Sequence, residues 1–183
     1  MIAFSDETGV ELTPNACRTW APVGQTPVLR HTYKREKSSV IGAITWDPVA
    51  DDCDCLIHIH DHGVIASDQV IVFLNGLHEM TDRPVVLIWD NITTHHSKIV
   101  KEYIAANSDW LTVVNLPSYS PDLNPIEFLW SVWKRTYLAN VCKNKIEQVT
   151  DILIENQAAL SDQDLLKGCI IGAGLTDRTE SEI

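Results

Sequence analysis

The stretch Ser118-Tyr119-Ser120-Pro121-Asp122-Leu123-Asn124-Pro125-Ile126-Glu127-Phe128-Leu129-Trp130 marks the point where the chain turns into a helix that carries an acidic side chain. Its prolines and turn-forming residues predict a rigid loop. The helix is predicted to begin at Asn124, a good N-cap, with Pro125 at the first helical position, where its missing N–H is not needed. Glu127 lies in the first turn, about 100° from the predicted buried face. That face consists of Ile126, Trp130, Trp133 and Tyr137, which recur at helical spacing.

Glu127 has two interpretations at this stage. Asn124-x-x-Glu127 has the form of a capping box, in which the glutamate side chain bonds back to the cap residue. The same position also suits a functional carboxylate, because a stiff loop and the first turn of a helix hold the side chain in place. The choice depends on whether other acids lie nearby.

Two other acids follow apolar runs that predict strands, the first of them over residues 1–10. Pro84–Trp89 is a short apolar run that indicates a buried strand, and it leads directly into Asp90. Ligands of open α/β sheets bind outside the carboxyl ends of the strands. Asp6 follows the apolar N-terminal run, and strand alternation places it on the same face as Ile2 and Phe4. A carboxylate beside a core needs a partner or a metal ion. Asp6 and Asp90 are therefore candidate site residues.

Three blocks of residues resemble the DDE endonuclease domain of bacterial IS630-type transposases, a group within the Tc1/mariner superfamily. The blocks are Phe4-Ser5-Asp6-Glu7, then Asp90-Asn91 with His95 five positions after the aspartate, then Ser120-Pro121-Asp122-Leu123-Asn124-Pro125-Ile126-Glu127 with Trp130. The segment from Arg18 to Pro27 also resembles the one that follows the first aspartate there. The matches run from about residue 4 to residue 135, which is most of the chain.

The resemblance implies a ribonuclease H-like α/β fold, with a mixed five-stranded sheet flanked by helices. In that fold Asp6 lies on the central first strand, Asp90 at the end of the neighbouring fourth strand, and Glu127 on a helix packed against the sheet. The three acids are then the expected catalytic residues and hold two Mg²⁺ or Mn²⁺ ions. Asn91 is expected either to orient Asp90 or to supply turn polarity. His95 is expected either to lie near the scissile phosphate or to hold a loop.

The implied activity is that of a cut-and-paste DNA transposase, which cleaves phosphodiesters at element ends and joins the freed 3′-OH to target DNA. A nuclease or resolvase that only hydrolyses is an alternative on the same fold. A catalytically silent remnant that binds a partner is a second alternative. The expected partners are element ends and target DNA, with a homodimer expected by analogy and no membrane.

Length and composition predict one domain. With the resemblance, it is expected to be the catalytic domain over residues 1–167, followed by a loosely ordered tail over residues 168–183. The net charge of −11 argues against a simple DNA-binding module. The helix-turn-helix region that precedes the catalytic domain in the family is absent from this sequence, so the chain alone is expected to bind DNA weakly. Scattered cysteines, five in number, favour reduced thiols. The expected location is the bacterial cytoplasm, in association with the nucleoid.

The densest positive charge lies between Val28 and Lys37. This segment is either a solvated hairpin or a loop that contacts DNA phosphates beside the active site. Its candidate DNA contacts are Arg30, Lys34, Arg35 and Lys37. The preceding residues, Cys17 to Gly24, are predicted to form a strand that ends in a turn at Pro22–Gln25.

A row of histidines raises the question of a second metal. Alternation along a strand places His58, His60 and His62 on one side. Three ligands in line along one extended strand are too far apart to close a zinc tetrahedron unaided. The stretch is therefore predicted to be a half-exposed strand with a polar outer side, with structural zinc as the alternative.

The remaining elements alternate between strand and helix. The predicted order, an antiparallel front part followed by parallel strands with helical crossovers, indicates an α/β domain with a mixed sheet. Strands are expected at 38–46 and 111–116, and helices at 67–80, 97–107 and 144–160, the last opened by a capping box at Asn144 and Glu147.

Overall fold

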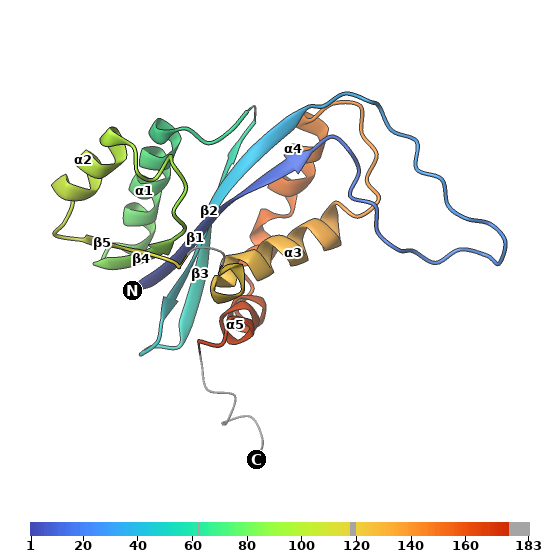
Figure 1. Ribbon diagram of the computed structural model, residues 1–183. Coiled ribbons are helices and arrows are strands. Elements are labelled where there is room, and N and C mark those ends of the chain that lie inside the picture. Colours follow the sequence, from blue (N-terminus) through green and yellow to red (C-terminus); the bar gives the residue numbers. More distant parts are fainter. Residues whose placement is uncertain (62, 118–119, 176–183) are drawn as a thin grey trace, which may run out of the picture.

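The chain forms one five-stranded sheet in the order β3-β2-β1-β4-β5, with helices on both faces (Figure 1). The computed structural model describes residues 1–61, 63–117 and 120–175. The strands are β1 (Ile2–Glu11), β2 (Lys37–Asp47), β3 (Asp52–His60), β4 (Val85–Trp89) and β5 (Leu111–Asn115). β1 pairs antiparallel with β2, and β2 pairs antiparallel with β3. β1 and β5 both pair parallel with β4, so the predicted mixed sheet is confirmed.

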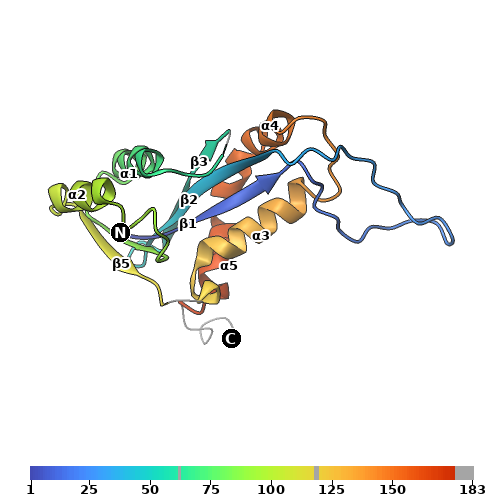
Figure 2. The same cartoon turned by 45° about the horizontal axis from the view of Figure 1, so that its top comes forward.

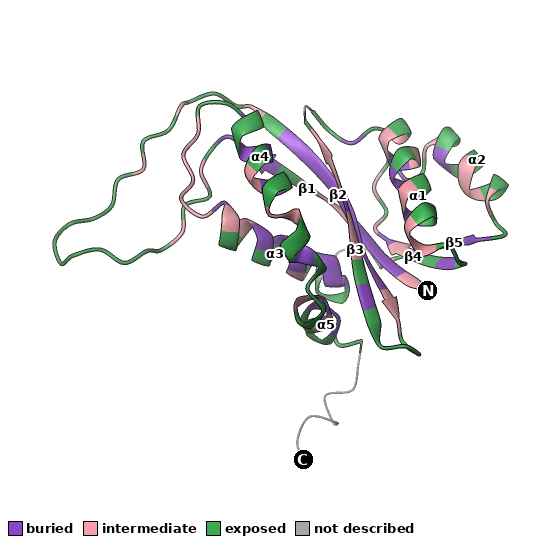
Figure 3. Ribbon diagram, turned by 180° about the vertical axis from the view of Figure 1, so that it is seen from behind, coloured by how far each residue is buried: buried purple, intermediate pink, exposed green. Residues whose placement is uncertain are grey.

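Helices cover the two faces of the sheet in separate groups. α1 (Ser67–Thr81) and α2 (Lys98–Ala106) pack on one face, and α3 (Pro125–Tyr137), α4 (Glu147–Glu155) and α5 (Gln163–Gly172) pack on the other. Because β1 is covered on both sides, its residues alternate between the two cores: Ala3 joins the α1 side, and Phe4 and Val10 join the α3 side. Figure 3 shows the buried residues along β1 and β2 between these layers.

Helix starts follow the sequence only in part. Ser97 caps α2 as predicted, since its hydroxyl accepts a hydrogen bond from the N–H of Val100. At α1 the N-cap residue is Ala66, whose N–H donates to the side chain of Gln69. Asn144, where the sequence predicts a capping box, is not the N-cap of α4, because the helix begins after Ile146.

The helix predicted over residues 144–160 is shorter than expected. α4 begins at Glu147 after Ile146, without a side-chain cap at its N-terminus. It ends at Glu155, and a short 3₁₀ helix, η2 (Gln157–Ser161), continues the path. Leu160 is still buried, so the apolar pattern reflects packing across both pieces rather than one continuous helix.

A long connection between β1 and β2 departs from the body of the molecule (Figure 2). Residues 12–36, here called the arm, contain no strand, so the strand predicted at 17–24 is wrong. The predicted turn is confirmed, because the N–H of Gln25 donates to the carbonyl of Pro22 and Gly24 takes a positive φ of 79°. Trp20 is 99% exposed and Tyr33 is 95% exposed, so these aromatic side chains are not part of the core.

The C-terminal segment is more ordered than predicted. α5 extends to Gly172, past residue 168, where the sequence predicts a loosely ordered tail. Cys169 and Ile170 are buried in the same core as α3, which explains the difference: the small, glycine-containing sequence still supplies one apolar helix face. The rest of the predicted tail, residues 176–183, lies outside the described residues. Within the described part of the chain, each helix is too short or too polar to cross a membrane.

Candidate functional site

Asp6 and Asp90 meet at one level of the sheet. β1 and β4 run parallel with Phe4 opposite Ile88. Two residues further along each strand, this register brings Asp6 beside Asp90. Neighbouring strands are about 4.8 Å apart, so two acids far apart in sequence become neighbours in space.

The N-terminus of α3 brings Glu127 to the same place. Asn124 is the N-cap residue, as predicted, but its side chain makes no capping bond. It is buried, and its amide donates to the carbonyl of Ser5 at 3.1 Å, next to Asp6 on β1. The side chain of Asn124 therefore ties the start of α3 to β1. Glu127, three residues later, is exposed. Residues Ser118 and Tyr119 of the preceding loop lie outside the described residues.

The electrostatics indicate that negative charges surround Asp6. Burial raises the pKa of Asp6, and the negative charges of Glu127, Glu7 and Asp90 raise it further, to about 7. Like charges oppose the ionisation of a neighbouring carboxyl group, so this shift is consistent with the predicted placement of Glu127 and Asp90 near Asp6.

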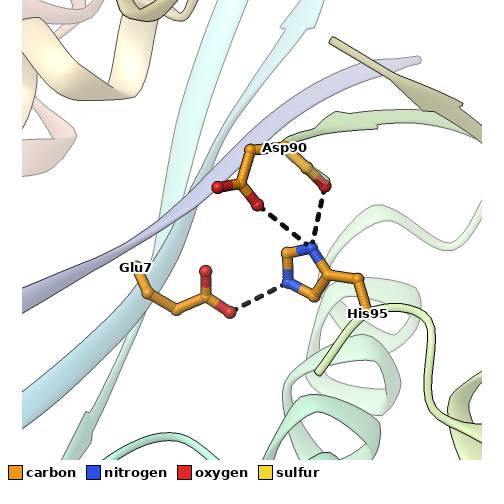
Figure 4. Close-up of side chains that lie close together, drawn as sticks. All are labelled: Glu7, Asp90 and His95. Carbon is orange, nitrogen blue, oxygen red and sulfur yellow. Dashed lines mark hydrogen bonds and ion pairs between the residues drawn. The ribbon is translucent and has the colours of Figure 1, made fainter. Parts of the chain in front are cut away.

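A histidine links two of the acidic residues across the sheet (Figure 4). Nε2 of His95 donates to Oε1 of Glu7 at 2.9 Å. Nδ1 of His95 lies 3.1 Å from the backbone oxygen of Asp90 and 3.3 Å from its Oδ1. The His95 ring also stacks on Trp89, with centroids 3.8 Å apart. In the described part of the chain, Glu7, Asp90 and His95 form the group of potential metal-ligating side chains whose ligand atoms lie within 4.8 Å of one another.

These contacts shift the pKa values of both partners. Burial lowers the pKa of His95, but the hydrogen bonds to Asp90 and Glu7 and the charge of Glu7 outweigh burial and raise it to about 9. Burial raises the pKa of Asp90, but the hydrogen bonds from His95 and from the N–H of Ile92 together lower it. At neutral pH these shifts favour the charged forms of His95 and Asp90.

Other predicted site residues have different environments. The amide of Asn91 donates to the carbonyl of Leu116 at 2.8 Å, so it fastens the loop after β4 to the end of β5. The side chain of His95 is 1% exposed, and its ring nitrogens face Glu7 and Asp90, which favours the loop-holding role over contact with a scissile phosphate. The basic candidates Arg30, Lys34 and Arg35 lie exposed on the arm, and Lys37 lies exposed at the start of β2.

The histidine row forms the predicted strand. His58 and His60 lie on β3 and are half-buried, and Cys55, Ile57 and Ile59 on the alternate positions pack against the core. His62 lies outside the described residues. Neither His58 nor His60 belongs to a metal-ligating group among the described residues.

Sequence reasoning missed Lys134. Its ammonium donates to the hydroxyl of Thr8. Burial lowers the pKa of Lys134, and the negative charges of Glu127 and Asp6 oppose that effect. The helical spacing could have predicted it, because Lys134 lies two turns after Glu127, on the same side of α3.

Comparisons with known proteins identify the family of the chain. The sequence model of the family described as DDE superfamily endonuclease matches residues 1–150. Comparison with curated protein sequences gives no match.

Solved structures of the Mos1 transposase share the fold. The Mos1 paired-end complex with the left transposon end superposes with a TM-score of 0.69 at 21% identity, over 94% of this chain and 52% of that one. The Mos1 mariner paired-end complex with Mn gives 0.70 at 20% identity, over 94% and 52% of the two chains. The isolated catalytic domain of Mos1 mariner transposase gives 0.61 at 17% identity, over 94% and 76%.

This chain therefore spans about half the length of the Mos1 chains in the two complexes. The likeness confirms the expected ribonuclease H-like architecture, with its mixed five-stranded sheet and flanking helices. The family resemblance drawn from the acidic blocks is confirmed by the family match over most of the sequence. The chain belongs to the DDE superfamily endonucleases.

Proposed function

We propose that this chain is the catalytic domain of a Tc1/mariner-type cut-and-paste DNA transposase, with Asp6, Asp90 and Glu127 as its catalytic carboxylates. The observation that carries the proposal is the convergence of these three acids, from β1, the end of β4 and the first turn of α3. The raised pKa of Asp6 reflects that convergence. A cluster of carboxylates is costly for a fold, which favours a cationic ligand in the functional state.

The donor set fits Mg²⁺ or Mn²⁺. Both ions prefer carboxylate oxygens, and three acids suffice for two ions when one acid bridges them. We assign Asp6, Asp90 and Glu127 as the ligands. Two Mos1 structures contain Mn or Mg, which supports the same metal class here. Bound ions would supply activation of the attacking oxygen and stabilisation of the leaving oxygen.

The protein's own residues would hold and orient these groups. Asn124 fixes the start of α3, and thereby Glu127, against the strand that carries Asp6. His95 holds the Asp90 carboxylate through Nδ1. Lys134 supplies a positive charge beside Asp6 and Glu127, which reduces their mutual repulsion in the metal-free protein.

The DNA partners are proposed on chemical grounds. The exposed positive charges of the arm, at Arg30, Lys34 and Arg35, suit contact with a phosphate backbone. Similar Mos1 structures are complexes with transposon ends, which supports element ends and target DNA as substrates. A homodimer would let two copies bring two ends together, and the location that we propose for this activity is the bacterial cytoplasm, in association with the nucleoid.

A nicking and joining assay tests the function. The purified chain is incubated in Mn²⁺ with supercoiled plasmid and with pre-cleaved DNA ends that carry a free 3′-OH. We expect nicking and joined products from the wild-type protein. Loss of at least about a hundredfold is expected in Glu127→Gln, beyond the range typical of changes around a metal ligand. Asp122→Asn, an exposed acid in the preceding loop, serves as the matched control.

The outcomes separate the alternatives. Nicking without joining would favour a nuclease or resolvase. Absence of both activities, together with absence of Mn²⁺ binding, would favour a silent remnant. Equal nicking by the wild-type protein and Glu127→Gln would show that Glu127 is not catalytic. It would then be only an acidic residue in the first turn of α3.

A further inference from the structure

Glu7 is a half-buried acid without a place in the proposed metal site. It follows Asp6 on β1, and strand alternation turns its side chain to the opposite face of the sheet, where α1 and α2 pack. The side chain is 15% exposed. Its carboxylate accepts the hydrogen bond from Nε2 of His95 (Figure 4). Partial burial of a carboxylate costs desolvation free energy, and the hydrogen bond from His95 offsets part of that cost.

Further contacts hold the His95 ring in place. Its ring stacks on Trp89 at an interplanar angle of 5°. Trp89 is itself held, because its indole N–H donates to Oδ1 of Asn115 at 3.2 Å. The backbone of the loop adds a turn, in which the N–H of His95 donates to the carbonyl of Ile92 at 3.2 Å. The imidazole therefore cannot reorient without disturbing the end of β4.

The three side chains form a hydrogen-bonded chain rather than a metal site of their own. Both ring nitrogens of His95 face oxygen atoms, at 2.9 Å for Glu7 and at 3.1 and 3.3 Å for Asp90. Because both ring nitrogens already face oxygen atoms of Glu7 and Asp90, neither is open to a metal ion. The Glu7 carboxylate at Nε2 fixes the orientation of the ring. In many metal sites an outer carboxylate orients a residue that binds the ion. Here Glu7 would be the outer carboxylate, and His95 lies between it and Asp90.

We propose that Glu7 is a positioning residue that acts through His95 to fix the orientation of the Asp90 carboxylate for metal binding. The inference rests on the proposed function, because it takes Asp90 as a metal ligand. The Asp90 side chain is 39% exposed, so it can bind an ion through its open side while His95 holds Oδ1. Glu7 touches neither metal nor DNA in this account.

The test is a double-mutant cycle read out as Mn²⁺ affinity. Calorimetric titrations are made on the wild-type chain, Glu7→Gln, His95→Gln and the double variant, with the metal-free melting temperature as a check on folding. His96→Gln is the matched control, since His96 is the exposed neighbour. We expect Mn²⁺ affinity to fall roughly tenfold in Glu7→Gln and by at least as much in His95→Gln. In the double variant, Glu7→Gln should add no further loss, because its effect passes through His95.

Each other outcome has a distinct meaning. Wild-type affinity in a folded Glu7→Gln would overturn the positioning role while leaving the metal site intact. Losses that multiply in the double variant would make Glu7 an independent ligand and also overturn it. Failure of the wild-type chain to bind Mn²⁺ would overturn both this inference and the proposed function. If His95→Gln fails to fold, His95→Asn replaces it in the cycle, because only the double variant separates action through His95 from direct binding by Glu7.

Discussion

At the scale of single residues, burial and the negative charges of its neighbours raise the pKa of Asp6. Its pKa of about 7 in the metal-free protein means that the carboxyl group is mostly protonated at pH 6 and mostly ionised at pH 8. A metal ion binds the ionised form, so binding at low pH must release a proton.

The prediction is that Mn²⁺ affinity falls on the order of tenfold between pH 8 and pH 6, in proportion to the ionised fraction of Asp6. Calorimetry in two buffers of different ionisation enthalpy would measure both the affinity and the proton release near pH 6. An affinity that is constant over this range, without proton release, would contradict the assignment of Asp6 as a ligand.

His95 predicts how the stability of the metal-free protein depends on pH. Its pKa is raised from 6.5 to about 9, so the folded state binds an additional proton between these values. The resulting stabilisation is fully present below pH 6.5 and is lost as the pH rises through 9. The free energy of unfolding should therefore fall by about 3 kcal/mol over this window.

Urea unfolding at pH 6.5 and pH 9 measures this change. His95→Gln should be less stable at pH 6.5 and should lose most of the pH dependence. His96→Gln should retain it, because His96 is exposed. A wild-type protein that is equally stable at the two pH values would show that His95 does not carry its charge in the folded state.

The sequence predicted Asp6, Asp90 and Glu127 because each has a local signal: it follows an apolar run or lies in the first turn of a predicted helix. The link through Glu7 could not be predicted in the same way. Alternation turns Glu7 away from Asp6, and its partner His95 is 88 residues distant in sequence. Only the parallel register of β1 and β4 brings them together.

At the scale of elements, the seating of α3 on the sheet sets the position of Glu127. Gly42 on β2 pairs with Asp6 on β1. A Cβ atom at Gly42 would lie 2.7 Å from Cη2 of Trp130 on α3, 2.8 Å from Cδ1 of Ile57 and 3.0 Å from the backbone oxygen of Leu56. These distances are too short, so α3 can approach the sheet here only because the residue is glycine.

Gly42→Ala is expected to lower the free energy of unfolding by about 1–3 kcal/mol through overpacking. It should also weaken Mn²⁺ binding, because the displaced α3 carries Glu127 away from Asp6. Gly9→Ala is the matched control on the neighbouring strand, where an added Cβ meets no atom within 4 Å. Denaturant unfolding and Mn²⁺ titration of both variants make the comparison. Equal behaviour of the two variants would contradict the tight seating of α3.

Helices and strands with strong apolar patterns were predicted correctly. A strand predicted where there is no neighbouring strand to pair with was not. β4, β5 and α2 agree with their predicted ranges within one or two residues because each is a short, periodic run between clear boundaries. The strand predicted at 17–24 fails because no strand in the described structure lies beside the arm to pair with it. Propensity alone does not form a strand without a neighbour.

At the scale of the whole molecule, charge is unevenly distributed. The net charge is −11, yet Arg30, Lys34 and Arg35 extend from the body on the arm. DNA binding by this chain alone should therefore be weak, sensitive to salt and dependent on the arm.

Replacing Arg30, Lys34, Arg35 and Lys37 together with glutamine should weaken duplex binding at low salt and flatten its salt dependence. Each lost phosphate contact should reduce the slope of log K against log salt by about 0.9. The control replaces Lys98 and Lys101, two exposed lysines of α2. Fluorescence anisotropy over a salt series makes the measurement. A nanomolar complex that resists salt, or one unchanged in the arm variant, would contradict this distribution of roles.

The central claim is that three acids from distant parts of the chain form one metal site. Calorimetric titration of Mn²⁺ at pH 8 into the wild-type chain, Asp90→Ala and Asp122→Ala tests it most directly. We predict saturable binding by the wild-type protein and by Asp122→Ala, whose substituted residue lies exposed in the loop before α3, and no binding by Asp90→Ala. Absence of binding by the wild-type protein, or equal binding by Asp90→Ala, would contradict the grouping of Asp6, Asp90 and Glu127 as one site.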